Sequence, residues 1–270
     1  MKAKRSLGQH FLVSGSALEK IADSVSISPE EVIVEIGPGH GELTEKLLER
    51  GAGVIAVEKD EDLVSGLKKK FKGEIGDSRL NILHSDIREL DASDILPKGT
   101  SRYKLVGNIP YYITGFLLRS FLSRPPRPER IVFLVQKEVA ERVARSKKES
   151  LLSLSVKAYG DPKYEGVVKA GSFSPPPKVD SAILSIININ NPFTNQQEEE
   201  LFFKILRKGF SQKRKTLIGN LSKDIDDEVL KRAFERSSLD LKVRAEDVVP
   251  EKWFEMVSFI KKEAPDLSVT

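Results

Sequence analysis

Three parts of the sequence contain residue types that suit the binding of a nucleotide-like cofactor. The first is the glycine-rich segment 37–41, which follows an apolar run. The second is a pair of acids, Glu58 and Asp86, and the third is the tetrapeptide Asn108-Ile109-Pro110-Tyr111. Glycine lets the backbone approach a ligand because it has no Cβ, carboxylate and amide oxygens accept hydrogen bonds, and an aromatic ring offers a base a stacking face.

The spacing of the glycines distinguishes between cofactor classes. A dinucleotide fingerprint has the form G-x-G-x-x-G and cradles a pyrophosphate. Here the third glycine, Gly41, comes one residue early, and Glu42 stands where the last glycine would be. Because a carboxylate repels a pyrophosphate, the segment favours a ligand without phosphates, such as S-adenosylmethionine. The structural alternative is a glycine turn that only joins a strand to a helix.

Glu58 and Asp86 each follow an apolar run, at residues 53–57 and 80–83. Glu58 lies about twenty residues beyond the glycine turn, where a βαβ unit places the carboxylate that binds ribose hydroxyls. Asp86 is placed to accept a hydrogen bond from an adenine amino group. The alternatives are a surface acid at a strand end for Glu58 and the cap of a short helix for Asp86.

The tetrapeptide Asn108-Ile109-Pro110-Tyr111 is the most chemically specific part of the chain. Pro110 fixes φ and stiffens the turn. Asn108 offers an amide oxygen, and we expect the Pro110 carbonyl to be free of a helical partner, so that two acceptors can hold one exocyclic amine. The Tyr111 ring offers a base a face to stack on. A purely structural turn is the alternative interpretation.

The elements that position these residues follow from hydrophobic periodicity. Strands are expected at residues 32–36, 53–58, 80–83, 103–107, 131–135, 164–170 and 182–187. After a turn-rich break at 188–192 the pattern becomes helical, at residues 198–210, 213–221, 227–236 and 250–262. The expected fold is α/β with a mostly parallel sheet in residues 1–188, and a small all-helical domain in residues 189–270. Residues 6–12, which precede the first strand, could fold over the cofactor as a lid.

Composition excludes several function classes. The chain has 270 residues, no cysteine and three histidines. Disulfides, thiol catalysis and Cys-based zinc sites are therefore excluded, and no metal site is expected. No apolar run approaches a membrane span, and no long apolar region follows the basic N-terminus. We therefore expect no membrane association and a cytoplasmic location.

The charge pattern bears on the partner. The net charge is only +4, but Lys and Arg cluster at residues 68–70, 124–130, 145–148 and 213–215. Any one cluster is explained as a solvated face, whereas several together favour a phosphate-binding surface.

Together these motifs resemble those of the ribosomal RNA adenine dimethyltransferases, the KsgA/Dim family, to which the resistance methylases of large-subunit rRNA are related. The resemblance covers nearly the whole chain. It is carried by the motifs Gly8-Gln9-His10-Phe11-Leu12, Glu35-Ile36-Gly37-Pro38-Gly39, Gly107-Asn108-Ile109-Pro110-Tyr111, Leu134-Val135-Gln136-Lys137-Glu138-Val139, Phe173-Ser174-Pro175-Pro176-Pro177-Lys178-Val179-Asp180-Ser181 and Phe210-Ser211-Gln212-Lys213-Arg214-Lys215-Thr216-Leu217.

The resemblance implies a Rossmann-like class I methyltransferase domain that uses S-adenosylmethionine. The implied substrate is a pair of adjacent adenosines near the 3′ end of small-subunit (16S) rRNA, each methylated twice on N6 within an assembling small subunit. The implied cofactor contacts are Gln9, His10, Leu12, Glu35, Gly37, Gly39, Gly41, Glu58, Asp86 and Asn108.

The resemblance also implies roles in substrate binding. Asn108, Pro110 and Tyr111 would hold the target adenine, and Phe173 would stack on its other side. Packing in the core is the alternative for Phe173. The basic segment Lys213, Arg214 and Lys215 would bind rRNA phosphates, and a monomer is expected.

Three other functions compete with this one: a resistance-type methylase of large-subunit rRNA, a non-catalytic assembly or transcription factor of the same fold, and a nicotinamide dehydrogenase. Segment 213–217 and the triple proline at 175–177 favour the small-subunit group. The intact segments 37–41 and 108–111 argue against a non-catalytic factor. The chain departs from the family at His10 and Tyr112, where Asn is frequent, and the bulkier Tyr112 is expected to alter packing at the pocket entrance.

Overall fold

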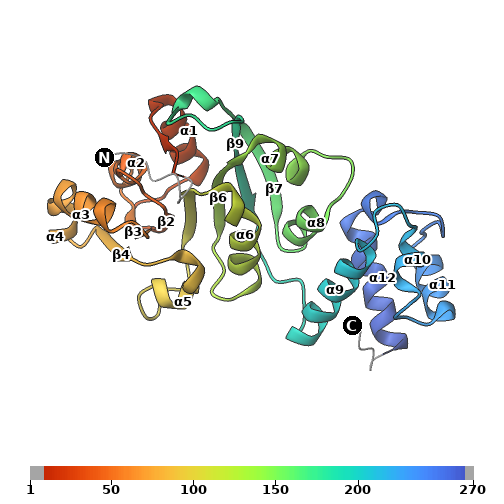
Figure 1. The fold of residues 1–270 in the computed structure, drawn as a ribbon. Helices are drawn as coiled ribbons and strands as arrows, with labels where there is room; N and C mark the ends of the chain where they lie inside the picture. Colours follow the sequence, from red (N-terminus) through yellow and green to blue (C-terminus); the bar gives the residue numbers. More distant parts are fainter. Residues whose placement is uncertain (1–8, 265–270) are drawn as a thin grey trace. The chain divides into compact units, whose positions relative to one another are not determined.

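The computed structural model describes residues 9–264, so residues 6–8 of the expected lid lie outside the described part. The chain forms two compact units (Figure 1). The first contains the described residues up to Ala144 together with Gly160–Asn190, and the second contains Arg145–Tyr159 and the described residues from Asn191 onward. The sequence pattern had placed residues 145–159 in the first domain.

The first unit is built on a seven-stranded sheet in the order β4-β3-β2-β5-β6-β9-β7. Strands β4, β3, β2, β5 and β6 are parallel to one another, whereas β9 is antiparallel to both of its neighbours. The predicted α/β fold with a mostly parallel sheet is confirmed. The strands are β2 (Val32–Ile36), β3 (Gly53–Glu58), β4 (Leu80–His84), β5 (Lys104–Asn108), β6 (Arg130–Gln136), β7 (Asp161–Val168) and β9 (Ser181–Ile187).

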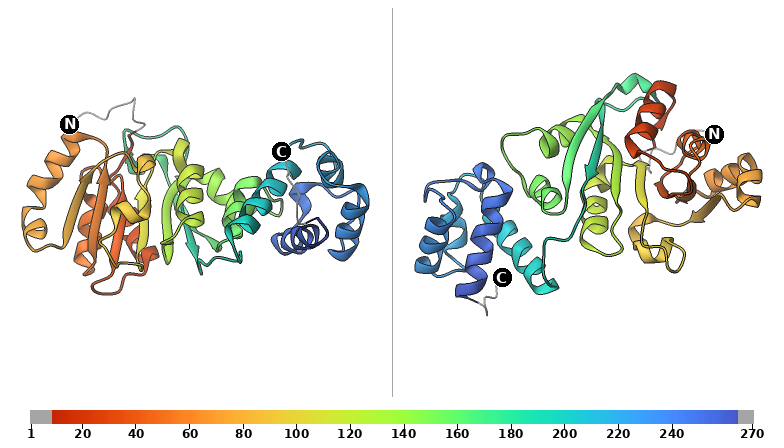
Figure 2. Two further views of the ribbon diagram at one scale, coloured as in Figure 1. Left: turned by 90° about the horizontal axis from the view of Figure 1, so that it is seen from below. Right: turned by 180° about the vertical axis from the view of Figure 1, so that it is seen from behind.

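Helices connect the parallel strands, and Figure 2 shows them around the sheet from two further directions. Asp60 caps α3 by accepting a hydrogen bond from the Asp62 N–H. The helices of this unit are α1 (Gly15–Val25), α2 (Glu42–Glu49), α3 (Glu61–Lys70), α4 (Lys72–Gly76), α5 (Ala92–Ile95), α6 (Thr114–Ser123) and α7 (Lys137–Ala144). Three 3₁₀ turns, η2 (Ile87–Glu89), η3 (Tyr111–Ile113) and η4 (Ala170–Ser172), join other elements.

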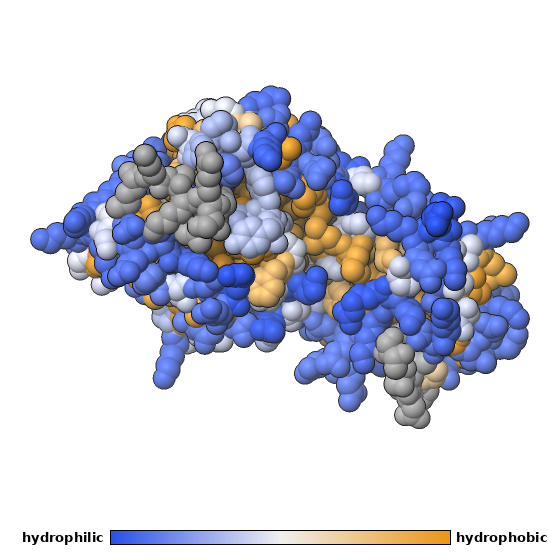
Figure 3. All heavy atoms as spheres, in the orientation of Figure 1, coloured by the Kyte–Doolittle hydropathy of each residue, from blue (hydrophilic) through white to orange (hydrophobic). Residues whose placement is uncertain are grey.

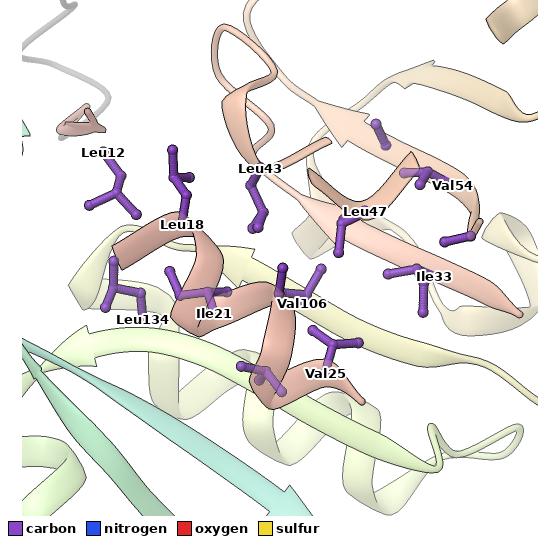
Figure 4. Packing of buried hydrophobic residues seen from close by; sticks show 14 of the residues in the cluster. Leu12, Leu18, Ile21, Val25, Ile33, Leu43, Leu47, Val54, Val106 and Leu134 are labelled. Carbon is purple, nitrogen blue, oxygen red and sulfur yellow. The ribbon is translucent and has the colours of Figure 1, made fainter. Parts of the chain in front are cut away.

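A hydrophobic core fills the space between the sheet and helices α1 and α2. Leu18, Ile21 and Val25 lie on one side of α1 and pack with Val106 and Leu134 of the sheet (Figure 4). This spacing of three and four residues is that of an amphipathic helix. This core packs against the central strands and so fixes the positions of their carboxyl ends.

A second, two-stranded sheet was missed by sequence patterns. Strand β1 (Phe11–Leu12) pairs antiparallel with β8 (Phe173–Ser174), and the Val13 N–H donates to the Ser172 carbonyl at 2.8 Å. The pairing attaches the N-terminal arm to a loop more than 150 residues later in the chain. Two-residue strands with so distant a partner leave no periodic signal.

The second unit is helical in the part of it that the structure describes. Its described elements are α8 (Leu151–Lys157), α9 (Gln196–Gly209), α10 (Leu217–Leu221), α11 (Asp227–Arg236), the 3₁₀ turn η5 (Ala245–Asp247) and α12 (Pro250–Glu263). Its core includes the fully buried Trp253 and Phe234. Tyr159, just after α8, contacts the rings of Phe193 and Phe203, which explains why this segment belongs to the helical unit. Within residues 9–264, no helix has the length and apolar character needed to cross a membrane.

One expected helix is shorter than predicted. Residues 213–215 form an exposed turn, and α10 begins only at Leu217. Thr216 caps the helix by accepting the Gly219 N–H at 3.2 Å. A Thr in this position starts a helix rather than continuing one.

The close approach of β2 and β5 depends on Gly107. A Cβ at Gly107 would lie 2.7 Å from the Ile36 carbonyl oxygen, so Gly107→Ala is expected to lower the free energy of unfolding by about 1–3 kcal/mol. Gly66→Ala in α3 is the matched control, because no atom lies within 4 Å of its Cβ position. It is expected to raise that free energy by about 0.5–1 kcal/mol. Urea denaturation measures both, and equal stabilities would contradict the packing argument.

Candidate active site

A cleft of about 340 Å³ lies at the carboxyl ends of the parallel strands of the first unit. The chain turns to opposite sides of the sheet after β2 and after β5, and open α/β sheets bind ligands at such a switch point. Five separate segments contribute to the walls, at residues 9–11, 36–37, 57–63, 85–88 and 108–113.

The Glu58 carboxylate, at the end of β3, organises one side of the cleft. Its Oε1 accepts the N–H groups of Lys59 at 2.8 Å and Asp60 at 2.9 Å, and its Oε2 accepts the Gly39 N–H at 3.3 Å. Burial raises the pKa of Glu58, whereas these backbone hydrogen bonds oppose the rise. Since a carboxylate oxygen can accept two hydrogen bonds, Oε2 retains a position for a hydroxyl donor.

The glycine turn has the left-handed backbone that its sequence suggests, with φ of +67° at Gly37, +62° at Gly39 and +85° at Gly41. Only Gly37 lines the cleft. A Cβ at Gly39 would lie 3.0 Å from the Phe11 ring, and one at Gly41 would lie 2.8 Å from Leu67. Gly39 and Gly41 therefore shape the turn and are not cleft-lining residues.

Glu35 is a predicted cofactor contact that lies beneath the turn, outside the cleft lining. It is 1% exposed, and its Oε2 accepts a hydrogen bond from Thr44 Oγ1 at 2.6 Å. Burial raises the pKa of Glu35 to about 8, and the negative charges of Glu58 and Glu42 act in the same direction. The geometry thus makes Glu35 a link between β2 and α2.

Asp86 satisfies both interpretations of its sequence position. It caps η2 by accepting the Arg88 N–H at 3.0 Å, and it lines the cleft. The Arg88 guanidinium binds both carboxylate oxygens, and Lys59 Nζ lies 2.7 Å from Oδ2. The Arg88 side chain, with help from Lys59, holds the pKa of Asp86 well below its usual range, so the group is a permanent acceptor.

The tetrapeptide after β5 forms the opposite side of the cleft. Asn108 Nδ2 donates to the His10 carbonyl at 2.9 Å, which leaves Oδ1 as an acceptor. The expectation for Pro110 was wrong, because its carbonyl accepts the Ile113 N–H at 3.1 Å within η3. A 3₁₀ turn closes such a bond over three residues, and the carbonyl keeps its second lone pair.

Tyr111 lies between the cleft and β9. Its hydroxyl and Ser181 Oγ are 2.7 Å apart and share a hydrogen bond, and burial raises the pKa of the hydroxyl. The ring lines the cleft and is held in place at its far end. It is thereby suited to offer a fixed stacking face.

The N-terminal arm forms another wall. Gln9 Nε2 donates to Asp60 Oδ2 at 3.1 Å, and His10 Nδ1 lies 2.8 Å from the Pro175 carbonyl oxygen. The Phe11 and His40 ring centroids are 4.4 Å apart. These contacts place residues 9–11 against the cleft, in the position that the lid prediction requires.

Two predicted site residues lie in the core and do not line the cleft. Leu12 and Phe173 face each other across the β1–β8 pair. Both belong to the hydrophobic cluster around α1. Phe173 is 4% exposed, so its ring packs against apolar neighbours and is not available to a base. This corrects the stacking role that the family resemblance implied.

Sequence patterns missed part of the cleft lining. Lys59 and Arg88, which bind Asp86 at the cleft edge, were not predicted. Tyr112 was expected at the pocket entrance, and it is exposed and lines the cleft. Lys59 and Arg88 are each within two residues of a predicted site residue, and that proximity is the signal that could have identified them. Lys59 follows β3 whereas its partner Asp86 follows β4, and a contact between two strand ends leaves no signal in the sequence.

The side chains in the cleft fit S-adenosylmethionine better than a dinucleotide. Glu58 and Asp86 are acceptors suited to ribose and adenine groups, and apolar residues such as Leu63 and Ile87 also line the cleft. A pyrophosphate at the glycine turn would meet Glu58 and the acids Glu42 and Glu45 in the first turn of α2. The same acids favour a ligand that carries positive charge.

Comparison with known proteins identifies close relatives along the chain. The family model described as "Ribosomal RNA adenine dimethylase" matches residues 1–262. A protein named ribosomal RNA small subunit methyltransferase A, from Dehalococcoides mccartyi (strain CBDB1), is 42% identical over 94% of this chain and 87% of its own length. A protein of the same name from Geobacter metallireducens is 40% identical over 80% of this chain and 79% of its own length.

Solved structures show the same fold. A dimethyladenosine transferase from Plasmodium falciparum has a TM-score of 0.80 and 26% identity, and the match covers 94% of this chain and 98% of that one. The 23S rRNA methyltransferase ErmE has a TM-score of 0.75 and 23% identity, covering 93% of this chain and 99% of that one. At this identity the likeness to ErmE shows the fold alone.

The buried Glu35 makes stability depend on pH. Its pKa is raised to about 8 in the folded chain, so between its ordinary value and 8 the folded state keeps a proton that the unfolded state has lost. The contribution of Glu35 to the free energy of unfolding is therefore complete at low pH. It falls as the pH rises towards 8, by up to about 1.4 kcal/mol per pH unit. The neutral variant Glu35→Gln lacks this contribution.

Urea denaturation of both proteins at about pH 5 and about pH 8 measures the effect. Glu35→Gln is expected to gain stability relative to the wild type as the pH rises between these values. Equal pH dependence of the two proteins would show that Glu35 is not held protonated.

Proposed function

The chain belongs to the ribosomal RNA adenine dimethylase family, and on this premise we propose that it methylates two adjacent adenosines near the 3′ end of small-subunit (16S) rRNA. The donor is S-adenosylmethionine, and the products are N6,N6-dimethyladenosines. The observation that carries the proposal is a single cleft in which Glu58 and Asp86 face Asn108, Pro110 and Tyr111. The partner is the small subunit during its assembly, and the chain acts as a monomer.

The strand-end acids account for cofactor binding. Bound S-adenosylmethionine supplies an electrophilic methyl group on a sulfonium. Glu58 Oε2 accepts a ribose hydroxyl. The ionised Asp86 accepts the adenine amino group in place of one of its present hydrogen bonds from Arg88 or Lys59. Gly37 lets the backbone approach, and Gln9 and His10 cover the cofactor from the arm.

Asn108 and Pro110 act on the target amine. The amine is a poor nucleophile because its lone pair is delocalised into the ring. Hydrogen bonds from its N–H groups to Asn108 Oδ1 and the Pro110 carbonyl draw the nitrogen towards a tetrahedral shape and direct its lone pair at the methyl group. No strong base is needed, so catalysis consists of positioning and of acceptors placed where positive charge develops.

The target base must leave its stack to reach the cleft. The Tyr111 ring, anchored through Ser181, replaces part of the stacking that the base gives up. Phe173 contributes indirectly, because it packs beneath the arm that carries His10.

The helical unit is proposed to bind rRNA through Lys213, Arg214 and Lys215. All three are exposed in the turn before α10, and no ion pair with a described carboxylate involves them. The other basic clusters are partly neutralised, for example Lys70 by Glu45 at 3.1 Å. These exposed cations suit phosphate contacts.

The alternatives are less well supported. A resistance-type methylase of large-subunit rRNA shares the fold, but the relatives with the higher identity carry the small-subunit name. A non-catalytic factor has no need for the complete acceptor set at 108–111. A nicotinamide dehydrogenase is disfavoured by the acids around the glycine turn.

Removal of the Asn108 acceptor tests the mechanism. Asn108→Ala is expected to retain most cofactor binding but to lower methyl transfer by about 10²–10³-fold, because an acceptor of the developing charge is removed. The measurement is transfer of tritiated methyl groups to small subunits that lack the modification, with naked rRNA and large subunits for comparison. Asn81→Ala on the exposed face of β4 is the matched control. Wild-type turnover by Asn108→Ala would remove Asn108 from the mechanism.

Charge reversal tests the rRNA-binding role of the helical unit. Replacing Lys213, Arg214 and Lys215 by Glu is expected to weaken binding to small subunits and to reduce the slope of log affinity against log salt by about 0.7–0.9 for each phosphate that the protein no longer neutralises. Reversal of the exposed Lys68, Lys69 and Lys72 changes the net charge equally and is the control. If the two triple variants weaken binding equally, the loss comes from the change in net charge, and the specific role of residues 213–215 is contradicted.

A further inference from the structure

Helix α6 and the turn before it present an aromatic and basic face to the surrounding solvent. Tyr112 is 69% exposed and Phe116 is 46% exposed, and Arg119 is exposed as well. Spacings of four and three residues place these side chains along one side of a helix. The other side of α6 is buried through Leu117, Leu118, Phe121 and Leu122.

This face is continuous with the active-site cleft. Tyr112 is one of the residues at the mouth of the cleft, and Phe116 and Arg119 lead away from it along α6. Over the seven residues from Tyr112 to Arg119 a helix rises roughly 10 Å, which matches about three stacked nucleotides at 3.4 Å each. A strand with one base in the cleft can therefore continue along this face.

The composition of the face identifies its occupant. Aromatic rings are the side chains on which bases stack, and every base offers a π-face. Helix α6 contains no acidic residue. Figure 3 shows hydrophobic surface over the region of α6 with hydrophilic residues around it. An exposed apolar patch with a polar border marks an interaction site.

We propose that the face formed by Tyr112, Phe116 and Arg119 binds the RNA strand next to the target adenosine. The two rings stack on bases that lose a neighbour when the adenosine leaves the helix, and Arg119 contacts a backbone phosphate. The assignment rests on the proposed function. It adds residues that hold the adjacent nucleotides while one of two neighbouring adenosines occupies the cleft.

The probe is an RNA stem-loop with two adjacent adenosines in its loop and 2-aminopurine in place of a flanking base. Stacking on the protein changes the fluorescence, so one titration reports both affinity and contact. Phe116→Ala and Phe116→Leu are each expected to weaken binding about tenfold, whereas Phe116→Tyr keeps a ring and is expected to bind like the wild type. Arg119→Gln is expected to weaken binding and to lower its salt dependence.

Leu241→Ala is the matched control, since Leu241 is a 49% exposed apolar residue of the helical unit. Circular dichroism verifies the fold of each variant, and S-adenosylmethionine affinity is expected to be unchanged at Phe116 and Arg119. If Phe116→Leu binds the RNA as tightly as the wild type, the proposal that the Phe116 ring stacks on a base is wrong. A change in sedimentation mass without a change in RNA affinity would overturn the RNA assignment in favour of a protein contact.

Methyl transfer to unmodified small subunits separates the inference from the proposed function. The expected result is a raised KM for the subunit in Phe116→Ala with kcat retained. Transfer by the wild type together with an unchanged KM in Phe116→Ala would overturn the inference and leave the function. No transfer by a wild type whose stem-loop binding depends on Phe116 would overturn the function and leave the RNA-binding face.

Discussion

The Glu58 carboxylate is the interaction on which the cleft depends most. It accepts three backbone N–H groups, two from the residues that follow β3 and one from Gly39 in the turn after β2. Hydrogen bonds to an ionised acceptor are stronger than those between neutral groups, and they offset the cost of burying the acid. These hydrogen bonds fix the glycine turn to the next strand, and Gly37 of the turn lines the cleft.

The other walls are attached in the same way, by single polar contacts between distant segments. Asn108 holds the arm through the His10 carbonyl, Gln9 reaches Asp60 at the start of α3, and Tyr111 reaches Ser181 of β9. Several site residues therefore have two roles, since one atom supports the structure and another is left for a ligand. Asn108→Ala removes both the Nδ2 that holds the arm and the Oδ1 left for a ligand. Cofactor affinity measured beside methyl transfer therefore separates the two roles.

Local patterns predicted the parts of this site that follow from strand ends. Glu58, Asp86 and Asn108 were found because apolar runs mark buried strands and parallel strands deliver their following residues to one edge of the sheet. Phe173 was misassigned because its burial depends on the β1–β8 pairing across more than 150 residues. The Pro110 carbonyl was expected to be free because the 3₁₀ turn after it has no sequence marker as clear as a helix cap. Residues 145–159 were placed in the first domain because a helical pattern does not show with which unit the segment packs.

The acids around the glycine turn explain how a doubly wound sheet comes to suit a cofactor without phosphates. In dinucleotide-binding folds the positive end of the helix dipole faces the pyrophosphate. Here Glu42 and Glu45 lie in the first turn of α2, so carboxylates of the chain already offset that end of the dipole. Beneath them Glu35 stays buried with its pKa raised to about 8, and Glu58 binds the turn from the side. Glu42, Glu45 and Glu58 would oppose a phosphate at this place, whereas a cationic nucleoside would be attracted. The charge of the turn therefore favours one cofactor class, while the backbone geometry stays that of the wider fold.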